Sequence, residues 1–147
     1  MRRFFRKSSS PSANKPSAAE SKGAIILVVD DSPTETRIFT STLMKAGYEV
    51  ETATNGEEAV EVARSIKPDL ILMDVIMPVL NGYQATRLIR KDPDIADTPI
   101  IMVTTKDMQT DRTWGIRQGA TDYMVKPVDR QRLLERIAEL LDGDADA

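Results

Sequence analysis

Three carboxylates and one lysine stand where short apolar runs of the sequence end. Asp30 and Asp31 follow the first run, and Asp74 follows the third. Lys126 follows the fifth. If these runs are strands of one parallel sheet, the four side chains meet at one edge of it. Oxygen ligands suit Mg²⁺, Mn²⁺ or Ca²⁺, and a lysine ammonium pairs with phosphate, so the spacing predicts a pocket for a divalent cation and a phosphoryl group.

The composition limits the chemistry of such a pocket. The 147 residues include no cysteine and no histidine, which excludes thiolate and imidazole metal ligands, disulfides and phosphohistidine chemistry on this chain. A hydrophobic content of 41% and a charged content of 29% are ordinary for one soluble globular domain with a short extension. No apolar run approaches the roughly 20 residues that a membrane span needs.

The first 23 residues differ in composition from the rest. Residues 1–22 carry six basic residues and one acidic residue, a net charge of +5, so the remainder carries −8 of the total −3. Ser, Pro and Ala dominate without periodicity, which predicts a disordered basic arm over residues 1–23. Residues 1–7 combine basic side chains with two Phe; we expect a solvated tail with no specific role, and the alternative is a weak contact with an anionic membrane or an acidic partner. The acidic remainder argues against nucleic acid as a partner.

Apolar runs and amphipathic patterns alternate five times between residues 24 and 142. The expected strands are residues 25–29, 48–53, 69–73, 99–103 and 121–125. The expected helices begin at Pro33 and Gly56, end before Gly47 and Pro68, and then cover about 82–90, 107–117 and 129–141. Such alternation predicts an α/β fold, with a five-stranded parallel sheet and helices on both faces. We expect one domain over residues 24–142 and a short disordered tail over 143–147.

The first helix shows the pattern most fully. Ser32 is a typical N-cap residue, and Pro33 suits the first turn. Ile38, Phe39 and Leu43 lie at helical spacing, so we expect them on one buried face.

The ordered set of motifs resembles the CheY-like response regulator receiver domain of two-component signalling, over about residues 25–141. The resemblance rests on the acidic pair after the first strand, an Asp followed by MPxxxG, a Thr after the fourth strand and Lys-Pro after the fifth. The residues at these motifs are Met77, Pro78, Gly82, Thr104, Lys126 and Pro127. The family's flavodoxin-like strand order 2-1-3-4-5 is implied by the resemblance and not by the spacing. The strings DDSPTE and QGATDYMVKPV further resemble single-domain regulators of twitching motility and type IV pili in a chemotaxis-like system.

The resemblance implies a role for each acidic residue. Asp74 would be the phosphoacceptor that attacks a phosphohistidine on a kinase, and a carboxylate needs no general base for this because it is already ionised. Asp31, Asp74 and the backbone carbonyl of Ile76 would ligate Mg²⁺, while Asp30 would act through water. Without a cation the carboxylates repel one another, which predicts raised carboxyl pKa values.

The resemblance also implies a switch. Lys126 would pair with the phosphoryl group, and its bond to Pro127 would be cis. Thr104 would swing its hydroxyl onto the phosphoryl oxygen, and Tyr123 would follow by turning inward. The surface that reports the change would be the fourth helix, the fifth strand and the fifth helix. Pro78 and Gly82 would be structural.

The implied partners are a histidine kinase similar to CheA, or a phosphotransfer protein, and an unidentified output protein. Because the sequence ends six residues after the last helix, we expect no output domain on this chain. The protein would be a cytoplasmic monomer, or a weak dimer that depends on phosphorylation. It would catalyse only its own phosphorylation and dephosphorylation.

Two positions depart from the best-known chemotaxis member of the family. Ile76 stands where that protein has Asn, and Lys106 stands where it has Glu. Both positions flank the path of the hydrolytic water, so we expect the apolar Ile76 to slow dephosphorylation.

Other functions remain open from the residues alone. The protein could drain phosphate from a shared kinase. A flavin carrier would need a phosphate loop where Asp30 and Asp31 stand, and these carboxylates would repel phosphate. An Mg²⁺-dependent hydrolase with an Asp nucleophile would want a second Asp at position 76, where Ile stands.

Overall fold

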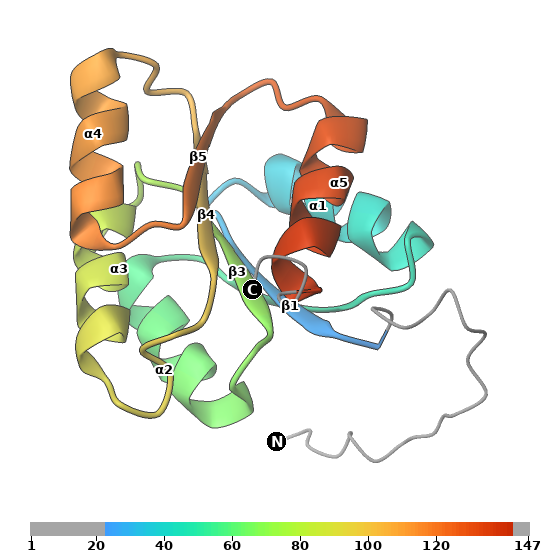
Figure 1. The fold of residues 1–147 in the computed structure, drawn as a ribbon, viewed down its shortest axis with the longest axis horizontal. Helices are drawn as coiled ribbons and strands as arrows, with labels where there is room; N and C mark the ends of the chain where they lie inside the picture. The colour runs from blue at the N-terminus through green and yellow to red at the C-terminus, as the bar shows by residue number, and fades with distance from the viewer. Residues whose placement is uncertain (1–22, 143–147) are drawn as a thin grey trace.

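Strands and helices alternate along the whole described chain in the computed structural model (Figure 1). The structure describes residues 23–142, so the predicted tail and the predicted arm, apart from Gly23, lie outside the described residues. In chain order the elements are β1 (Ile25–Val29), α1 (Pro33–Lys45), β2 (Glu49–Ala53), α2 (Gly56–Ile66), β3 (Leu70–Met73), α3 (Gly82–Lys91), β4 (Ile100–Thr104), α4 (Gln109–Gln118), β5 (Asp122–Val125) and α5 (Arg130–Leu141).

The five strands form one parallel sheet in the order β2-β1-β3-β4-β5, which confirms the expected fold. The strand register decides where the site forms. Val29, the last residue of β1, is paired with Met73, the last residue of β3. The carboxyl ends of these two neighbouring strands therefore lie level with each other, and the residues that follow them emerge at the same edge.

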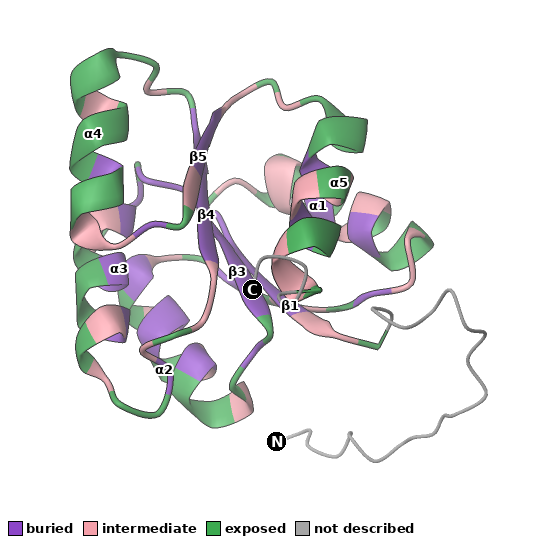
Figure 2. Ribbon diagram, in the orientation of Figure 1, coloured by how far each residue is buried: buried purple, intermediate pink, exposed green. Residues whose placement is uncertain are grey.

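Two apolar layers hold the helices on the sheet. Alternate residues of β1 point to opposite faces, as the period of a strand requires. Leu27 and Val29 pack in the cluster that includes α2 and α3, whereas Ile26 and Val28 pack in the cluster that includes α1 and α5. Figure 2 shows the central strands buried and the outer sides of the helices exposed. The central strands read as unbroken apolar runs because helices cover both of their faces.

The ends of the helices differ from the expected ends by one or two residues. Ser32 caps α1 as predicted, because its hydroxyl accepts a hydrogen bond from the Glu35 backbone over 3.2 Å. The α5 helix begins at Arg130 and not at Asp129, whose side chain instead caps the helix by accepting from the backbone N–H groups of its first turn. The α4 helix likewise begins at Gln109 and not at residue 107.

One prediction for the face of α1 is wrong. Phe39 and Leu43 are buried, but Ile38 is 45% exposed. Ile38 lines a hollow between α1 and α5 instead of the core, since these two helices do not close over the loops at this edge of the sheet.

The loop after β3 is held close to the start of α3. The Gly82 N–H donates a hydrogen bond to the Val75 carbonyl over 3.0 Å. A Cβ atom at Gly82 would collide with the backbone oxygen of Asp74, so only glycine fits this close approach. In the same loop Val79 has φ +71°, a left-handed conformation that is strained for a β-branched residue.

None of the helices described for residues 23–142 is long and apolar enough to cross a lipid bilayer.

Candidate functional site: an acidic cluster with one lysine

The three carboxylates predicted from the sequence come together at the carboxyl edge of the sheet. Asp30, Asp31 and Asp74 each offer one oxygen atom, and these atoms lie within 4.8 Å of one another. Asp30 and Asp74 are buried, whereas Asp31 is exposed. The cluster therefore has two fixed carboxylates within the protein and one that faces the solvent.

The Asp30 carboxylate is held at both of its oxygen atoms. One oxygen accepts a hydrogen bond from the Ser32 backbone N–H over 2.9 Å. The other accepts from the Lys126 ammonium over 2.8 Å. Asp30 is thus the group that anchors the lysine, and it ties β5 to the turn that starts α1.

The Asp74 carboxylate lies farther from the Lys126 ammonium than the Asp30 carboxylate does. Its Oδ1 accepts a hydrogen bond from the Val75 N–H over 2.7 Å, and its Oδ2 lies 3.7 Å from the Lys126 ammonium. Burial raises the pKa of Asp74, the Lys126 charge opposes this rise, and the Asp30 carboxylate adds to it. The predicted direction of the pKa shift holds for Asp74, but loss of water contributes more than repulsion between carboxylates.

Lys126 is the cation at the centre of the site. Its side chain is only 12% exposed, and its backbone N–H donates to the Thr104 carbonyl over 2.8 Å. Burial alone would lower the pKa of Lys126, but the hydrogen bond to Asp30 and the charge of Asp74 raise it above its usual value. Lys126 is therefore positively charged at neutral pH. The peptide bond between Lys126 and Pro127 is cis.

The backbone of Lys106 connects the two residues expected to form the switch. Thr104 is fully buried at the end of β4, and its hydroxyl lies 3.4 Å from the Lys106 N–H, which donates to it. The Tyr123 hydroxyl donates to the Lys106 carbonyl over 2.9 Å. A single peptide segment thus contacts both side chains.

Tyr123 is turned inward. It is 2% exposed, and burial raises the pKa of its hydroxyl far above the usual value. The Arg112 guanidinium lies 5.2 Å from the centre of the Tyr123 ring and donates to the Tyr123 carbonyl over 2.8 Å. The ring therefore lies on the inward side, and its movement on phosphorylation stays a prediction.

The loop beyond Asp74 faces the solvent. Ile76 is 54% exposed and Val79 is 74% exposed. Pro78 is also exposed, and its carbonyl accepts from the Leu80 N–H over 2.7 Å. Lys106, the second residue expected to tune the rate, forms an ion pair with Asp111 of α4 over 3.6 Å. Its ammonium is therefore directed to α4 in this conformation.

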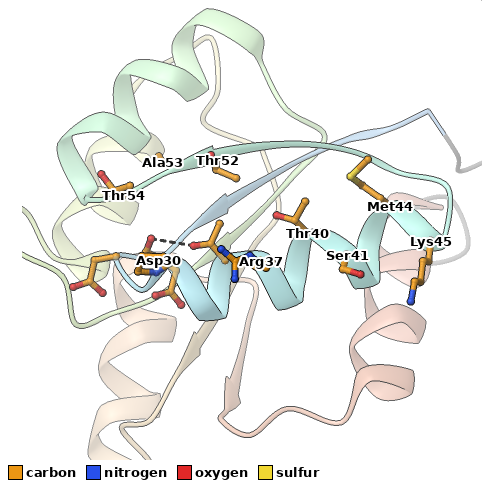
Figure 3. Close-up of a pocket in the computed structure, with 12 residues that line it drawn as sticks. Asp30, Arg37, Thr40, Ser41, Met44, Lys45, Thr52, Ala53 and Thr54 are labelled. Atoms are coloured by element: carbon orange, nitrogen blue, oxygen red, sulfur yellow. Dashed lines mark hydrogen bonds between the residues drawn. The ribbon is translucent and has the colours of Figure 1, made fainter.

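A hollow of about 720 Å³ lies beside the cluster, between α1 and β2. Figure 3 shows the side chains of Arg37, Thr40 and Met44 on α1 and of Thr52 and Thr54 at β2 around it. Asp30 and Asp31 line one end of the hollow, but among the described residues Asp74 and Lys126 do not line it. The hollow is thus a neighbour of the acidic cluster and not its entrance.

Two residues near the site were not singled out in the sequence. Glu35 lies 3.8 Å from the Lys126 ammonium, and Arg112 contacts Tyr123. Glu35 is the last residue of the string DDSPTE, but no role was predicted for it, and Arg112 belongs to none of the quoted motifs. Only the pairing of α1 with the end of β5, and of α4 with β5, brings them to the site.

Comparison with known proteins agrees with this geometry. The family described as "Response regulator receiver domain" matches residues 26–138, from β1 into α5. Protein PilH of Pseudomonas aeruginosa is 53% identical over 120 residues, which cover 82% of this chain and 99% of PilH. The chain spans 46% of the length of another relative, the probable transcriptional regulator ycf27 of Pyropia yezoensis, with 46% identity over 116 residues.

Solved structures show the same fold. The chemotaxis protein CheY4 of Vibrio cholerae is 38% identical with a TM-score of 0.75, over 79% of this chain and 97% of that one. The receiver domain of a sensor histidine kinase from Pseudomonas aeruginosa is also 38% identical with a TM-score of 0.75, over 82% of this chain and 98% of that one. That structure has a magnesium ion coordinated in its active site cleft.

Proposed function

Because the chain belongs to the response regulator receiver domain family of two-component signalling, we propose that Asp74 is its phosphoacceptor. The observation that carries the proposal is the position of the Asp74 Oδ2 atom. It lies 3.7 Å from the only ammonium group of the cluster of described residues, and it belongs to the same cluster as Asp30 and Asp31. The other Asp74 oxygen is held by the Val75 N–H. The side chain is thus fixed in place with one oxygen directed at the lysine.

In the proposed reaction the Asp74 carboxylate attacks the phosphorus atom of a phosphohistidine on the partner kinase. A P–O bond forms to Asp74 while the P–N bond breaks, and the imidazole leaves with the electron pair of that bond and takes up a proton. Lys126 pairs with the negative charge of the transferred group. Since a carboxylate is already ionised, this chain needs no general base, which suits a sequence without histidine.

Asp30, Asp31 and Asp74 fit a divalent cation, because they offer three close carboxylate oxygens and one lysine is their only positive partner among the described residues. Asp31 and Asp74, with the Ile76 carbonyl, would hold Mg²⁺ directly, and Asp30 would act through water. When bound, the metal supplies positive charge that neutralises the phosphoryl oxygens.

Thr104 and Tyr123 carry the proposed switch. The Thr104 hydroxyl leaves the Lys106 N–H to bind a phosphoryl oxygen, which moves the segment that also accepts from Tyr123. Tyr123 follows Thr104 through its hydrogen bond to the Lys106 carbonyl and is held inward. The surface made by α4, β5 and α5 then binds the output partner.

The similarity to PilH and to CheY4 supports a chemotaxis-like or twitching-motility pathway. The proposed phosphoryl donor is a histidine kinase of the CheA type or a phosphotransfer protein. The protein works in the cytoplasm, as a monomer or a weak dimer that depends on phosphorylation, and catalyses only its own phosphorylation and dephosphorylation.

The test is phosphorylation by a small donor. The full chain is incubated with acetyl phosphate and Mg²⁺, and its intact mass is measured. We expect a gain of one phosphoryl group in the wild type and none in Asp74→Asn, while Asp142→Asn, which changes an exposed aspartate at the end of α5, behaves as the wild type. Steady release of phosphate without a mass gain would instead indicate a hydrolase.

A further inference from the structure

Glu35 supplies a third carboxylate to the lysine of the site. It lies in the first turn of α1, where its backbone N–H is fixed by the Ser32 hydroxyl. Its Oε1 atom lies 3.8 Å from the Lys126 ammonium. Among the described residues, the ion pairs of Lys126 are therefore with Asp30 at 2.8 Å, Asp74 at 3.7 Å and Glu35 at 3.8 Å.

The three ion pairs are not equivalent. Only Asp30 lies within hydrogen-bonding distance of the ammonium. Asp74 and Glu35 lie at almost equal and longer distances, and they belong to different elements: Asp74 follows β3, whereas Glu35 is part of α1. Glu35 is also the most exposed of the three, with 39% of its side chain accessible. Asp30 thus anchors the lysine, while Glu35 and Asp74 compete for it.

An open hollow lies next to Lys126. Lys126 and Glu35 both line the hollow of about 440 Å³ between α1 and α5. Ile38 and Pro127 line the same space, and Ile38 is exposed there. The Lys126 side chain borders this hollow, but only 12% of it is exposed and Asp30 holds its ammonium. Its position is decided mainly by the carboxylates around it.

We infer that Glu35 is a positioning residue, which holds the Lys126 ammonium back from Asp74 in the unphosphorylated protein. This inference rests on the proposed role of Asp74 as phosphoacceptor. A phosphoryl group on Asp74 has to take Lys126 from Glu35, so the ion pair with Glu35 reduces the affinity of the site for a phosphoryl group. Glu35 thereby sets how far the equilibrium favours the resting state.

A double-mutant cycle tests whether Glu35 acts through Lys126. The affinity for beryllofluoride, a mimic of the phosphoryl group, is measured at saturating Mg²⁺ for the wild type, Glu35→Gln, Lys126→Gln and the double variant. Partly exposed ion pairs contribute up to about 1 kcal/mol, so we expect Glu35→Gln to bind beryllofluoride about twofold to fivefold more tightly than the wild type. In the Lys126→Gln background we expect the same change to have almost no effect.

Glu57→Gln is the matched control, because Glu57 also lies in the first turn of a helix and the substitution removes the same charge. If Glu35→Gln tightens binding equally with and without Lys126, Glu35 acts by direct repulsion and the inference is wrong. It is also wrong if Glu35→Gln weakens binding or leaves it unchanged. Lys126→Met replaces Lys126→Gln if the latter lowers the thermal midpoint of unfolding.

A second measurement does not depend on phosphoryl chemistry. The NMR order parameter of the Lys126 ammonium group reports how tightly it is held in the resting protein. We expect it to fall in Glu35→Gln and to stay unchanged in Glu57→Gln. An unchanged value in Glu35→Gln would overturn the inference even if the proposed function is correct. Failure of the wild type to bind beryllofluoride would instead contradict the proposed function, and the NMR result would still decide whether Glu35 restrains Lys126.

Discussion

The hydroxyl of Tyr123 donates a hydrogen bond to the backbone carbonyl of Lys106 over 2.9 Å. The N–H of the same residue donates to the hydroxyl of Thr104. The end of β4 and the middle of β5 are thereby joined through one residue of the loop that leads to α4. A movement of the Thr104 side chain therefore reaches Tyr123 without any change in the sheet.

Removing the Tyr123 hydroxyl tests the strength of this connection. We expect Tyr123→Phe to lower the free energy of unfolding by about 1 kcal/mol, because the Lys106 carbonyl loses its partner while the ring keeps its packing. Urea denaturation measures the change. Tyr48→Phe is the control, since Tyr48 is also buried but none of the hydrogen bonds found among the described residues uses its hydroxyl. Equal stability of Tyr123→Phe and the wild type would contradict the connection.

Ile76 is expected to slow the loss of the phosphoryl group. It lies two residues after Asp74, is 54% exposed and offers no polar group to orient a water molecule. We expect Ile76→Asn to shorten the lifetime of the phosphorylated protein about threefold, which corresponds to about 0.65 kcal/mol in barrier height. Decay of the radiolabelled phosphoprotein measures this. Val79→Asn, in the same exposed loop, serves as the control, and an unchanged lifetime in Ile76→Asn would refute a role in timing.

The raised pKa of Asp74 predicts a dependence of stability on pH. The folded protein binds the Asp74 proton more tightly than the unfolded chain, whose usual pKa is 3.8. The contribution of Asp74 to the free energy of unfolding is therefore greatest below pH 3.8. It decreases as the pH rises from 3.8 through the raised pKa of Asp74 in the folded protein. In the absence of Mg²⁺ we expect Asp74→Asn to be more stable than the wild type at pH 7, and the difference to vanish below pH 3.8. Thermal unfolding across this pH range measures the difference. A variant that is less stable than the wild type at pH 7 would contradict the prediction.

Magnesium is expected to stabilise the folded protein through Asp31. A ligand that binds only the folded state adds about 2.7 kcal/mol when its free concentration is about 100 times its dissociation constant. We expect this gain for the wild type and a much smaller gain for Asp31→Asn, in which an exposed ligand is lost without harm to the core. Calorimetric unfolding with and without Mg²⁺ measures both gains. Asp94→Asn, which removes an exposed aspartate away from the cluster, should respond as the wild type does.

Periodicity and motif spacing predicted the order of the elements and the meeting of Asp30, Asp31 and Asp74, because both depend on local patterns and on the geometry of parallel sheets. The predicted starts of α4 and α5 lie two residues and one residue before the observed starts. Capping side chains such as Asp129 satisfy the first N–H groups of a helix from outside it, so a polar residue at this point reads equally well as the first helical residue.

The remaining differences come from contacts between elements that are distant in the sequence. Arg112 of α4 donates a hydrogen bond to the Tyr123 carbonyl in β5, and Glu35 of α1 forms an ion pair with Lys126. Glu35 ends the quoted string DDSPTE, but the string alone does not indicate its contact with Lys126, because both contacts depend on how the helices pack on the sheet. Ile38 has the spacing of a core residue, yet it is exposed where α1 and α5 separate.

The most direct test of the central claim is to identify the residue that carries the phosphoryl group. The full chain is phosphorylated in the presence of Mg²⁺ and treated with borohydride, which reduces an aspartyl phosphate to homoserine, and its peptides are then sequenced by mass spectrometry. We predict homoserine at position 74 and nowhere else. Homoserine at position 30 or 31, or a phosphorylated chain in which Asp74 stays intact, would contradict the account.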